Sequence, residues 1–395
     1  MSLLSDYEQR TAWKYQPIRG LFHTADGLRN KVDESGSYMR FPGTTAVFRA
    51  DKTCCQAVQL IQRALGSRLE DSGMLASPLP ASTVHMTLHD LVSPEKCACD
   101  PGNGEQYEKE MADSLDRAAK AVMDIQRDFA GRKITLRADR IVNMVAKSLV
   151  LLLRPQTEED FALLLEMYRR FDPIVSLPYP LTPHITLAYF RPGTLDGDRL
   201  GAAVNLAQIS PDETLAFEFY PEGLTAQAFR DMASYQDVPE KICFCCDGGM
   251  NRSVLAAHIL NHQARERGLP VVAEARSAYE NTQGRPIPDQ VINTLKGYGI
   301  ETDGACRSAR YLQAKEAAFF SHFAPMTAGA MDRVSWLGLP DERARGLGRY
   351  FYGVRDPEYG EITHEQAFRE LWDRTEQYLD AFEIAYGKYL KSADM

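Results

Sequence analysis

The sequence predicts two consecutive domains: an α+β domain with two lobes over residues 1–235, and an α/β domain over residues 241–395. Three observations support this prediction. The chain has 395 residues, enough for two domains of ordinary size that each bury a core. Strand-like and helix-like segments alternate along the first half. The polar stretch 236–240 contains a proline, and we interpret it as a short linker between the domains.

The first domain is expected to contain short strands between amphipathic helices. Strands are predicted at residues 44–50, 133–142, 148–154 and 214–220, and helices at 53–65, 106–129, 157–171, 198–208 and 225–235. The helix start at Thr157 is well marked, because threonine is a good N-cap residue and Glu159 and Asp160 suit the positive end of the helix dipole. Residues 93–113 are polar and acidic and contain two prolines and two glycines, so we interpret them as an insertion.

A pattern of four residues occurs twice in this domain. The two copies are His85-Met86-Thr87-Leu88 and His184-Ile185-Thr186-Leu187. Residues two apart on a strand share one face, so His and Thr of each copy point to one side and the apolar residues point to the other. Two such strands side by side would present two imidazoles and two hydroxyls to one ligand. The pattern therefore predicts a site at His85, Thr87, His184 and Thr186.

Two imidazoles and two hydroxyls suit a phosphodiester. A neutral histidine can take a proton from the attacking group, and a protonated one can give a proton to the leaving oxygen. The threonine hydroxyls can donate to phosphate oxygens, so this chemistry requires no metal and no cofactor. The pattern resembles the two-histidine phosphoesterases, a superfamily that includes cyclic phosphodiesterases and 2′-5′ RNA ligase-like proteins. The resemblance covers roughly residues 1–235, and the insertion accounts for the long separation of 99 positions between the histidines.

The second domain begins with a different chemical pattern. Residues 241–246 are predicted to be a buried strand, and they lead into Asp247-Gly248-Gly249-Met250-Asn251-Arg252-Ser253 and then a helix. Backbone N–H groups of such a loop and of the helix start can hold a phosphate. The same positive field favours a thiolate at Cys246, and Arg252 can hold two phosphoryl oxygens. Ser253 is placed to donate to the thiolate.

This arrangement resembles the low-molecular-weight protein tyrosine phosphatases, which implies a parallel sheet with helices on both faces. The resemblance extends to residues 273–281, 284–291 and 295–300, and to Asp356-Pro357 before a helix predicted at 363–386. It implies that Cys246 is the nucleophile, Arg252 the phosphate clamp and Asp356 the general acid. Phosphate would be bound by the loop residues Asp247, Gly248, Gly249, Met250, Asn251 and Ser253.

Three loop positions depart from the family pattern. Gly249 replaces an asparagine, and glycine can still adopt the left-handed conformation that a cradle requires. Asn251 replaces a second cysteine, which removes the usual disulfide partner of the nucleophile. Asp247 places a carboxylate beside the nucleophile, where it would repel a phosphate dianion if it faced the pocket. These departures predict an altered substrate preference.

The two sites together suggest sequential processing, in which the first domain opens a cyclic phosphate of RNA or a nucleotide and the second removes the resulting phosphate. One alternative is a protein tyrosine or arginine phosphatase fused to an independent nucleotide-processing or nucleotide-sensing domain. Another is a phosphate-binding module that has lost turnover in one half.

Composition limits the partners and the compartment. The formal net charge of −9 argues against binding long nucleic acid. A phosphorylated small molecule, a nucleotide or an RNA end is therefore the expected substrate, and a phosphoprotein is a further candidate. We see no signal peptide and no long apolar run, and the eight cysteines indicate reduced thiols, so a cytoplasmic protein without a membrane partner is expected. The oligomeric state is left open.

Overall fold

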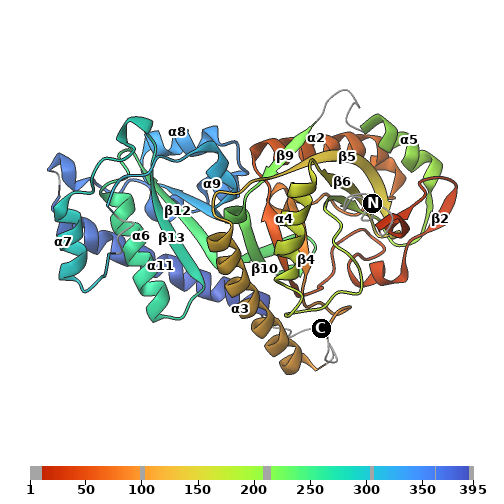
Figure 1. The fold of residues 1–395 in the computed structure, drawn as a ribbon, viewed down its shortest axis with the longest axis horizontal. Helices are drawn as coiled ribbons and strands as arrows, with labels where there is room; N and C mark the ends of the chain where they lie inside the picture. The colour runs from red at the N-terminus through yellow and green to blue at the C-terminus, as the bar shows by residue number, and fades with distance from the viewer. Residues whose placement is uncertain (1–10, 98–102, 208–214, 303–306, 361, 391–395) are drawn as a thin grey trace. The chain divides into compact units, whose positions relative to one another are not determined.

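The structure, a computed structural model, describes residues 11–97, 103–207, 215–302, 307–360 and 362–390. The chain divides into two compact units, which are coloured from red to green and from green to blue in Figure 1. Unit 1 is Met1–Gln236 with Tyr389–Met395, and unit 2 is Asp237–Lys388.

The described residues of unit 1 form two main antiparallel sheets. In the β5 sheet the strand order is β1-β5-β6-β7, and β9 also pairs with β5. In the β3 sheet the order is β11-β10-β3-β4. The strands of the β5 sheet are β1 (Tyr15–Gln16), β5 (Ile134–Met144), β6 (Ser148–Pro155), β7 (His184–Tyr189) and β9 (Ala216–Phe219). Those of the β3 sheet are β3 (Gly43–Arg49), β4 (His85–Asp90), β10 (Leu224–Asp231) and β11 (Ser234–Val238), and β2 (Leu21–His23) pairs separately with β8 (Thr194–Asp196).

Four of the five helices predicted for the first domain are present in unit 1. They are α2 (Lys52–Leu69), α3 (Gly104–Asp128), α4 (Glu158–Arg169) and α5 (Gly197–Ala207), with 3-10 turns at Ala12–Lys14, Asp26–Asn30, Glu70–Ser72, Ala81–Thr83 and Pro221–Gly223. The predicted helix start at Thr157 is confirmed, because its side chain accepts from the Asp160 N–H and Asp160 caps it in return. The α2 helix extends four residues beyond the predicted end at Leu65.

The predicted helix at residues 225–235 is wrong. This segment forms β10 and the start of β11. Alanine and glutamine favour a helix locally, but β10 pairs along its length with the fully buried strand β3, and α3 packs against it. The small side chains of Ala226 and Ala228 are fully buried there. Tertiary burial therefore overrides the local helix propensity.

Unit 2 is built on a parallel sheet of order β13-β12-β14. Its strands are β12 (Glu240–Cys246), β13 (Val271–Ser277) and β14 (His322–Pro325). Its helices are α6 (Arg252–Glu266), α7 (Asp289–Gly297), α8 (Ala328–Trp336), α9 (Asp341–Arg345), α10 (Gly348–Phe351) and α11 (His364–Leu390), with 3-10 turns at Glu280–Thr282, Ala314–Ala318 and Pro357–Tyr359. Figure 1 shows α6 and α11 on one side of the sheet and α8 on the other.

Residues 236–240 do not form the separate linker that was predicted. Gln236–Val238 end β11, and Glu240 begins β12. Since β11 is an edge strand and is only partly buried, its sequence needs no apolar run and looks like a connector.

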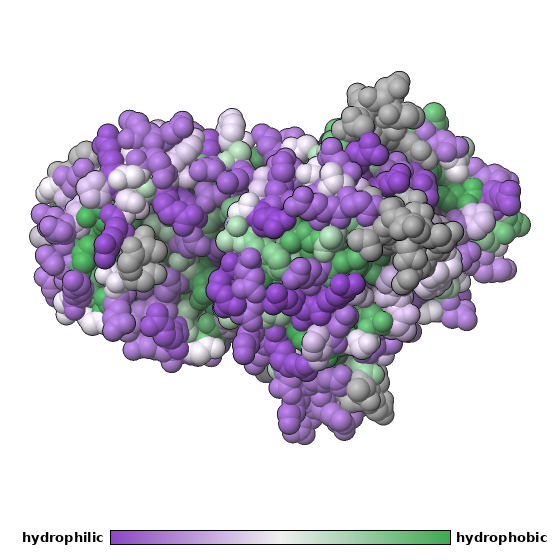
Figure 2. All heavy atoms as spheres, in the orientation of Figure 1, coloured by the Kyte–Doolittle hydropathy of each residue, from purple (hydrophilic) through white to green (hydrophobic). Residues whose placement is uncertain are grey.

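In the part of the chain that the structure describes, no helix is long and apolar enough to cross a membrane. The face seen in Figure 2 is mostly hydrophilic.

Candidate functional sites

The two His-x-Thr motifs lie on edge strands of different sheets in unit 1. β4 is at the edge of the β3 sheet, β7 is at the edge of the β5 sheet, and the two strands contact each other. In each motif the apolar residues are buried and the polar ones are half-buried, as strand alternation predicts. One cavity of about 420 Å³ is lined by all four predicted residues, which are His85, Thr87, His184 and Thr186.

Each motif strand has a register shift directly after its threonine. Ala46 pairs with His89 and Val47 with Thr87, and Leu149 pairs with Ala188 and Val150 with Thr186. A bulge of one residue reverses which side chains face the cavity further along a strand. Asp90 and Tyr189 therefore line the cavity as well, whereas His89 is buried away from it.

His184 is held in one orientation. Its Nδ1 lies 2.6 Å from the carbonyl oxygen of Thr182. A carbonyl can only accept, so Nδ1–H donates and Nε2 of the neutral ring carries the lone pair. Burial lowers the pKa of His184, so the ring is neutral at physiological pH. His184 therefore has the properties of a proton acceptor.

His85 is positioned by an aromatic neighbour. Its ring lies edge-on to Tyr235, with 5.1 Å between the ring centres. Tyr235 comes from β11 in the same sheet and also lines the cavity. The tyrosine was not identified from the sequence, because residues 225–235 were assigned to a helix.

Four lysines line the same cavity, and the sequence did not point to them. Lys14, Lys31, Lys96 and Lys147 come from four separate segments. Lys96 lies within the stretch that was interpreted as an insertion. The net charge of the whole chain is negative, so composition gave no sign of a local positive cluster.

In unit 2, Cys246 is the last residue of β12, and its side chain is 2% exposed. Its Sγ lies 3.2 Å from Ser253 Oγ and accepts from the Gly249 N–H at 3.3 Å. The adjacent Cys245 points to the opposite face of the strand, as predicted, since only Cys246 belongs to the core beneath α6. The thiol therefore lies at the base of the loop that leads into α6.

The loop approaches its neighbour very closely at Gly249. Its φ is +66°, which confirms the predicted left-handed conformation. A Cβ built there would lie 2.8 Å from the backbone nitrogen of Ser277. Only glycine fits this position.

Arg252 is the first residue of α6, and its guanidinium group lies near the carboxylates of Asp247 and Asp356. Its Nη2 lies 2.7 Å from Asp356 Oδ2 and 3.9 Å from Asp247 Oδ2, and its Nη1 donates to the Val354 carbonyl at 3.1 Å. The predicted nucleophile loop, arginine and aspartate therefore lie together. Arg252 Nε is buried with no hydrogen-bond partner among the described residues. An anion in the loop would supply that partner.

The remaining loop residues have identifiable contacts. Asp247 Oδ1 accepts from Thr327 Oγ1 at 2.7 Å, so its carboxylate is oriented by α8. Asn251 Nδ2 donates to Glu358 Oε2 at 3.2 Å, and Asn251 Oδ1 is buried without a partner among the described residues. Met250 packs against the core, and its Cε lies 3.1 Å from the position of a Cβ at Gly248.

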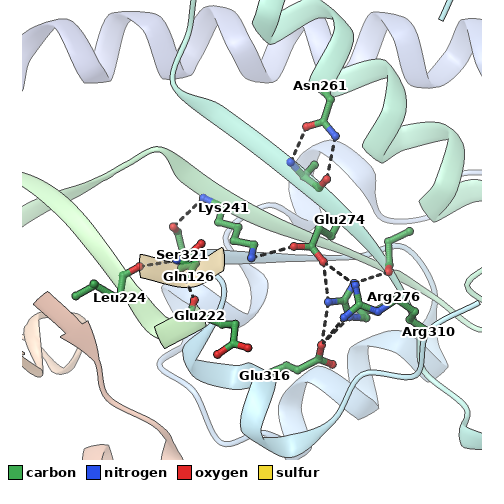
Figure 3. Close-up of polar contacts among 12 residues, drawn as sticks. Gln126, Glu222, Leu224, Lys241, Asn261, Glu274, Arg276, Arg310, Glu316 and Ser321 are labelled. Atoms are coloured by element: carbon green, nitrogen blue, oxygen red, sulfur yellow. Dashed lines mark hydrogen bonds and ion pairs between the residues drawn. The ribbon is translucent and has the colours of Figure 1, made fainter. Parts of the chain in front are cut away.

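A charged network joins β13 to β12, the strand that ends at Cys246 (Figure 3). Lys241 of β12 lies 2.9 Å from Glu274 of β13, and Glu274 also contacts Arg276 at 2.8 Å. Arg276 is in turn 2.8 Å from the buried carboxylate of Glu316. Burial by itself would raise the pKa of Glu274, but Lys241 and Arg276 lower it to about 2. The network links β12 to β13 and fixes the strand that carries Cys246.

Among the described residues, no group of three or more His, Cys, Asp or Glu side chains is arranged to hold a metal ion.

A buried cysteine at the end of a parallel strand, followed by a loop and a helix that begins with arginine, defines a cysteine-dependent phosphatase domain. Residues 241–392 match the family described as Low molecular weight phosphotyrosine protein phosphatase, and this region of the chain is a member of that family. The resemblance of the second domain to the low-molecular-weight protein tyrosine phosphatases is thereby confirmed.

Solved structures of similar proteins include two phosphatases. The low molecular weight protein tyrosine phosphatase from T. tengcongensis is 20% identical, with a TM-score of 0.32, over 36% of this chain and 99% of that one. The YwlE arginine phosphatase from Geobacillus stearothermophilus is 19% identical, with a TM-score of 0.31, over 38% and 97%. A conserved protein of unknown function, ATU0111 from Agrobacterium tumefaciens, is 16% identical, with a TM-score of 0.40, over 59% and 97%. No curated protein matches the chain.

Proposed function

We propose that the chain is a bifunctional phosphoesterase in which unit 1 opens a cyclic phosphodiester and unit 2 hydrolyses the resulting phosphomonoester. The observation that carries the proposal is the cavity of unit 1, where strands from two different sheets place both histidines and both threonines around one space. Candidate substrates are cyclic phosphates of RNA ends or of nucleotides, including ADP-ribose derivatives.

The first step uses the histidines as base and acid. His184 Nε2 takes a proton from water as its oxygen attacks phosphorus, since the neutral ring is fixed by Thr182. The P–O bond on the far side breaks, and protonated His85 gives its proton to the leaving oxygen. Thr87 and Thr186 donate to the non-bridging oxygens. The product is a phosphomonoester with a free hydroxyl.

The second step uses the cysteine loop. The Cys246 thiolate attacks the phosphomonoester, and Arg252 Nε and Nη2 hold two oxygens of the phosphoryl group. For Nη2 to do so, Asp356 must leave its ion pair with Arg252, which frees it to carry a proton to the leaving oxygen. Water then hydrolyses the phosphocysteine, Asp356 takes a proton from that water, and Ser253 Oγ stabilises the departing thiolate.

A screen of cyclic phosphodiesters and phosphomonoesters tests the proposal with three proteins: wild type, His184→Ala and Cys246→Ser. We expect His184→Ala to lose ring opening and to keep monoester hydrolysis. We expect Cys246→Ser to open the ring and to accumulate the monoester. Wild-type protein that opens a 2′,3′-cyclic nucleotide but leaves every monoester product intact would refute the coupled function.

A second candidate is a phosphatase for proteins, with unit 1 acting independently. The family assignment favours it, because it covers unit 2. Activity on phosphotyrosine or phosphoarginine peptides that is abolished by Cys246→Ser and unchanged in His85→Ala, together with no turnover of cyclic phosphodiesters, would support this candidate instead.

A further inference from the structure

The cavity of unit 1 carries more positive charge than a single phosphodiester requires. In the part of the chain that the structure describes, its charged lining, apart from the histidines, consists of four lysines and two carboxylates, Lys14, Lys31, Lys96, Lys147, Asp90 and Glu95. All six groups are described in the structure, and at neutral pH they leave a surplus of about two positive charges. This surplus is local, because the chain as a whole has a formal net charge of −9.

One pair of lysines lies around Tyr179. Lys96 Nζ is 2.6 Å from Asp90 Oδ2, and the Tyr179 hydroxyl donates to the same oxygen at 2.6 Å. Lys14 Nζ lies 4.4 Å from the centre of the Tyr179 ring, and Lys96 Nζ lies 5.3 Å from it. Both ammonium groups therefore lie near the ring of Tyr179, and Asp90 is ion-paired with Lys96.

The other pair lies around Glu95. Lys147 Nζ is 3.1 Å from Glu95 Oε1, and Lys31 Nζ is 3.8 Å from Glu95 Oε2. Lys31 also lies 4.6 Å from the centre of the Phe41 ring. Here two ammonium groups share one carboxylate. Because each pair of lysines is matched by a single carboxylate, each pair contributes one uncompensated positive charge to the cavity.

The uncompensated positive charge of the lysines destabilises the empty cavity. Burial lowers the pKa of Lys14 and of Lys31 to about 8, which shows that the cavity disfavours their charged forms. A bound phosphate would offset this cost, because an ammonium group is a compact charge that binds phosphate oxygens well.

The lysine cluster adjoins the reacting centre. Lys14 Nζ donates to Thr182 Oγ1 at 2.7 Å, and the carbonyl oxygen of the same threonine accepts from His184. A single small ligand in the cavity of about 420 Å³ can therefore contact both the histidines and the lysines.

We propose that unit 1 acts on cyclic phosphodiesters that carry a second phosphate group, either a phosphomonoester or a diphosphate. Lys14, Lys31, Lys96 and Lys147 bind this second group, while the histidines and threonines hold the diester. The inference rests on the proposed phosphodiesterase function and adds the class of substrate.

Two substrates that differ only in the second phosphate test the inference on the chain of 395 residues. They are adenosine 2′,3′-cyclic phosphate and the same compound with a 5′-phosphate. We expect kcat/KM for ring opening to be at least about tenfold higher for the doubly phosphorylated substrate, as charged hydrogen bonds to one more phosphate allow. Lys31→Gln and Lys147→Gln should bring this ratio close to one.

Lys133→Gln is the matched control. Lys133 is an exposed lysine of unit 1 that pairs with Glu218 outside the cavity, so its loss should leave the ratio at the wild-type value. A wild-type ratio near one, or a ratio that persists in both cavity variants, would overturn the inference while the phosphodiesterase function stood.

If neither substrate is opened, the proposed phosphodiesterase function fails. Phosphate recognition by the lysines is then tested without turnover, by the binding of inorganic pyrophosphate. Titration calorimetry would compare wild type, Lys31→Gln and Lys133→Gln, each of which retains the loop of unit 2. A binding site present in wild type and Lys133→Gln but missing in Lys31→Gln would support phosphate recognition by the lysines. Identical isotherms for the three proteins would overturn it.

Discussion

Replacing Gly249 by alanine tests the geometry of the phosphate loop directly. The new Cβ would lie 2.8 Å from both the Cβ and the backbone nitrogen of Ser277. Ser277 has little freedom to move, because it is fully buried, its N–H donates to the Arg310 carbonyl at 2.7 Å, and its Oγ donates to the Asp247 carbonyl at 2.8 Å. The loop itself must therefore shift.

The magnitude follows from two costs and one gain. The left-handed conformation costs a residue with a side chain about 1–2 kcal/mol. Overpacking costs about 1–3 kcal/mol more. Restriction of the unfolded chain returns about 0.4–1 kcal/mol. We therefore expect Gly249→Ala to destabilise unit 2 by about 2–4 kcal/mol.

Gly268→Ala is the matched control. Its φ is +62°, but among the described residues no atom beyond its chain neighbours lies within 4 Å of its Cβ position. The substitution therefore bears only the conformational cost of about 1 kcal/mol or less. It follows the far end of α6, a helix of 15 residues and so about 22 Å long. The control therefore separates the steric clash from the backbone strain.

Denaturant unfolding followed by tryptophan fluorescence measures both variants, because Trp336 and Trp372 lie in unit 2 and the third tryptophan, Trp13, lies in unit 1. Hydrolysis of p-nitrophenyl phosphate should fall at least about a hundredfold in Gly249→Ala, since the loop N–H groups are displaced. Gly268→Ala should keep its activity. Equal destabilisation of the two variants within about 0.5 kcal/mol, or full activity of Gly249→Ala, would refute the reasoning.

Three further predictions concern proton transfer and the charged network. Asp356→Asn should slow hydrolysis of an alkyl phosphate about 10²–10⁴-fold. It should slow hydrolysis of p-nitrophenyl phosphate much less, because p-nitrophenolate leaves without a proton. Equal slowing of the two substrates in steady-state assays would contradict the role of Asp356 as the acid. Because burial lowers the pKa of His184, the acidic limb of a pH profile of kcat/KM for ring opening should lie below the ordinary histidine value of 6.5, and a limb above that value would exclude His184 as the base. Glu274→Gln should destabilise unit 2 by about 1–3 kcal/mol at pH 7. Burial would raise the pKa of Glu274, but Lys241 and Arg276 lower it to about 2. The extra stability of the wild type over Glu274→Gln is therefore present above pH 4.5 and is lost as the pH falls toward 2. Denaturant unfolding of both proteins at pH 7 and pH 3 checks this, and an equal stability difference at the two pH values would contradict it.

The sequence predicted those elements whose local signals agree with their burial. The strand that ends at Cys246 is an apolar run next to a glycine-containing loop, and each level of the structure supports that assignment. The helix start at Thr157 was predicted because its cap is formed by neighbouring residues. The β10 strand was assigned to a helix because only its pairing with β3 makes it a strand.

In the candidate sites, too, the residues that the sequence revealed are those that lie close together in the chain. The His-x-Thr motifs and the loop from Cys246 to Ser253 are continuous in the chain, so their spacing was visible in the sequence. Asp356 was found by resemblance alone, and its contact with Arg252 spans more than a hundred residues of the chain. The cavity lysines carry no motif and could not be found from spacing.

The sequence by itself determined which chemical groups are present and which of them share a strand face or a loop, because these relations depend on the local backbone geometry. Only the tertiary structure decided that β4 and β7 lie at adjacent edges of two sheets, that bulges turn Asp90 and Tyr189 into the cavity, and that four lysines converge there. These relations depend on long-range packing, in which distant segments meet because their apolar faces are buried together. For the doubled His-x-Thr pattern, the structure therefore supplied the surrounding charge, and with it a substrate class that the motif alone does not specify.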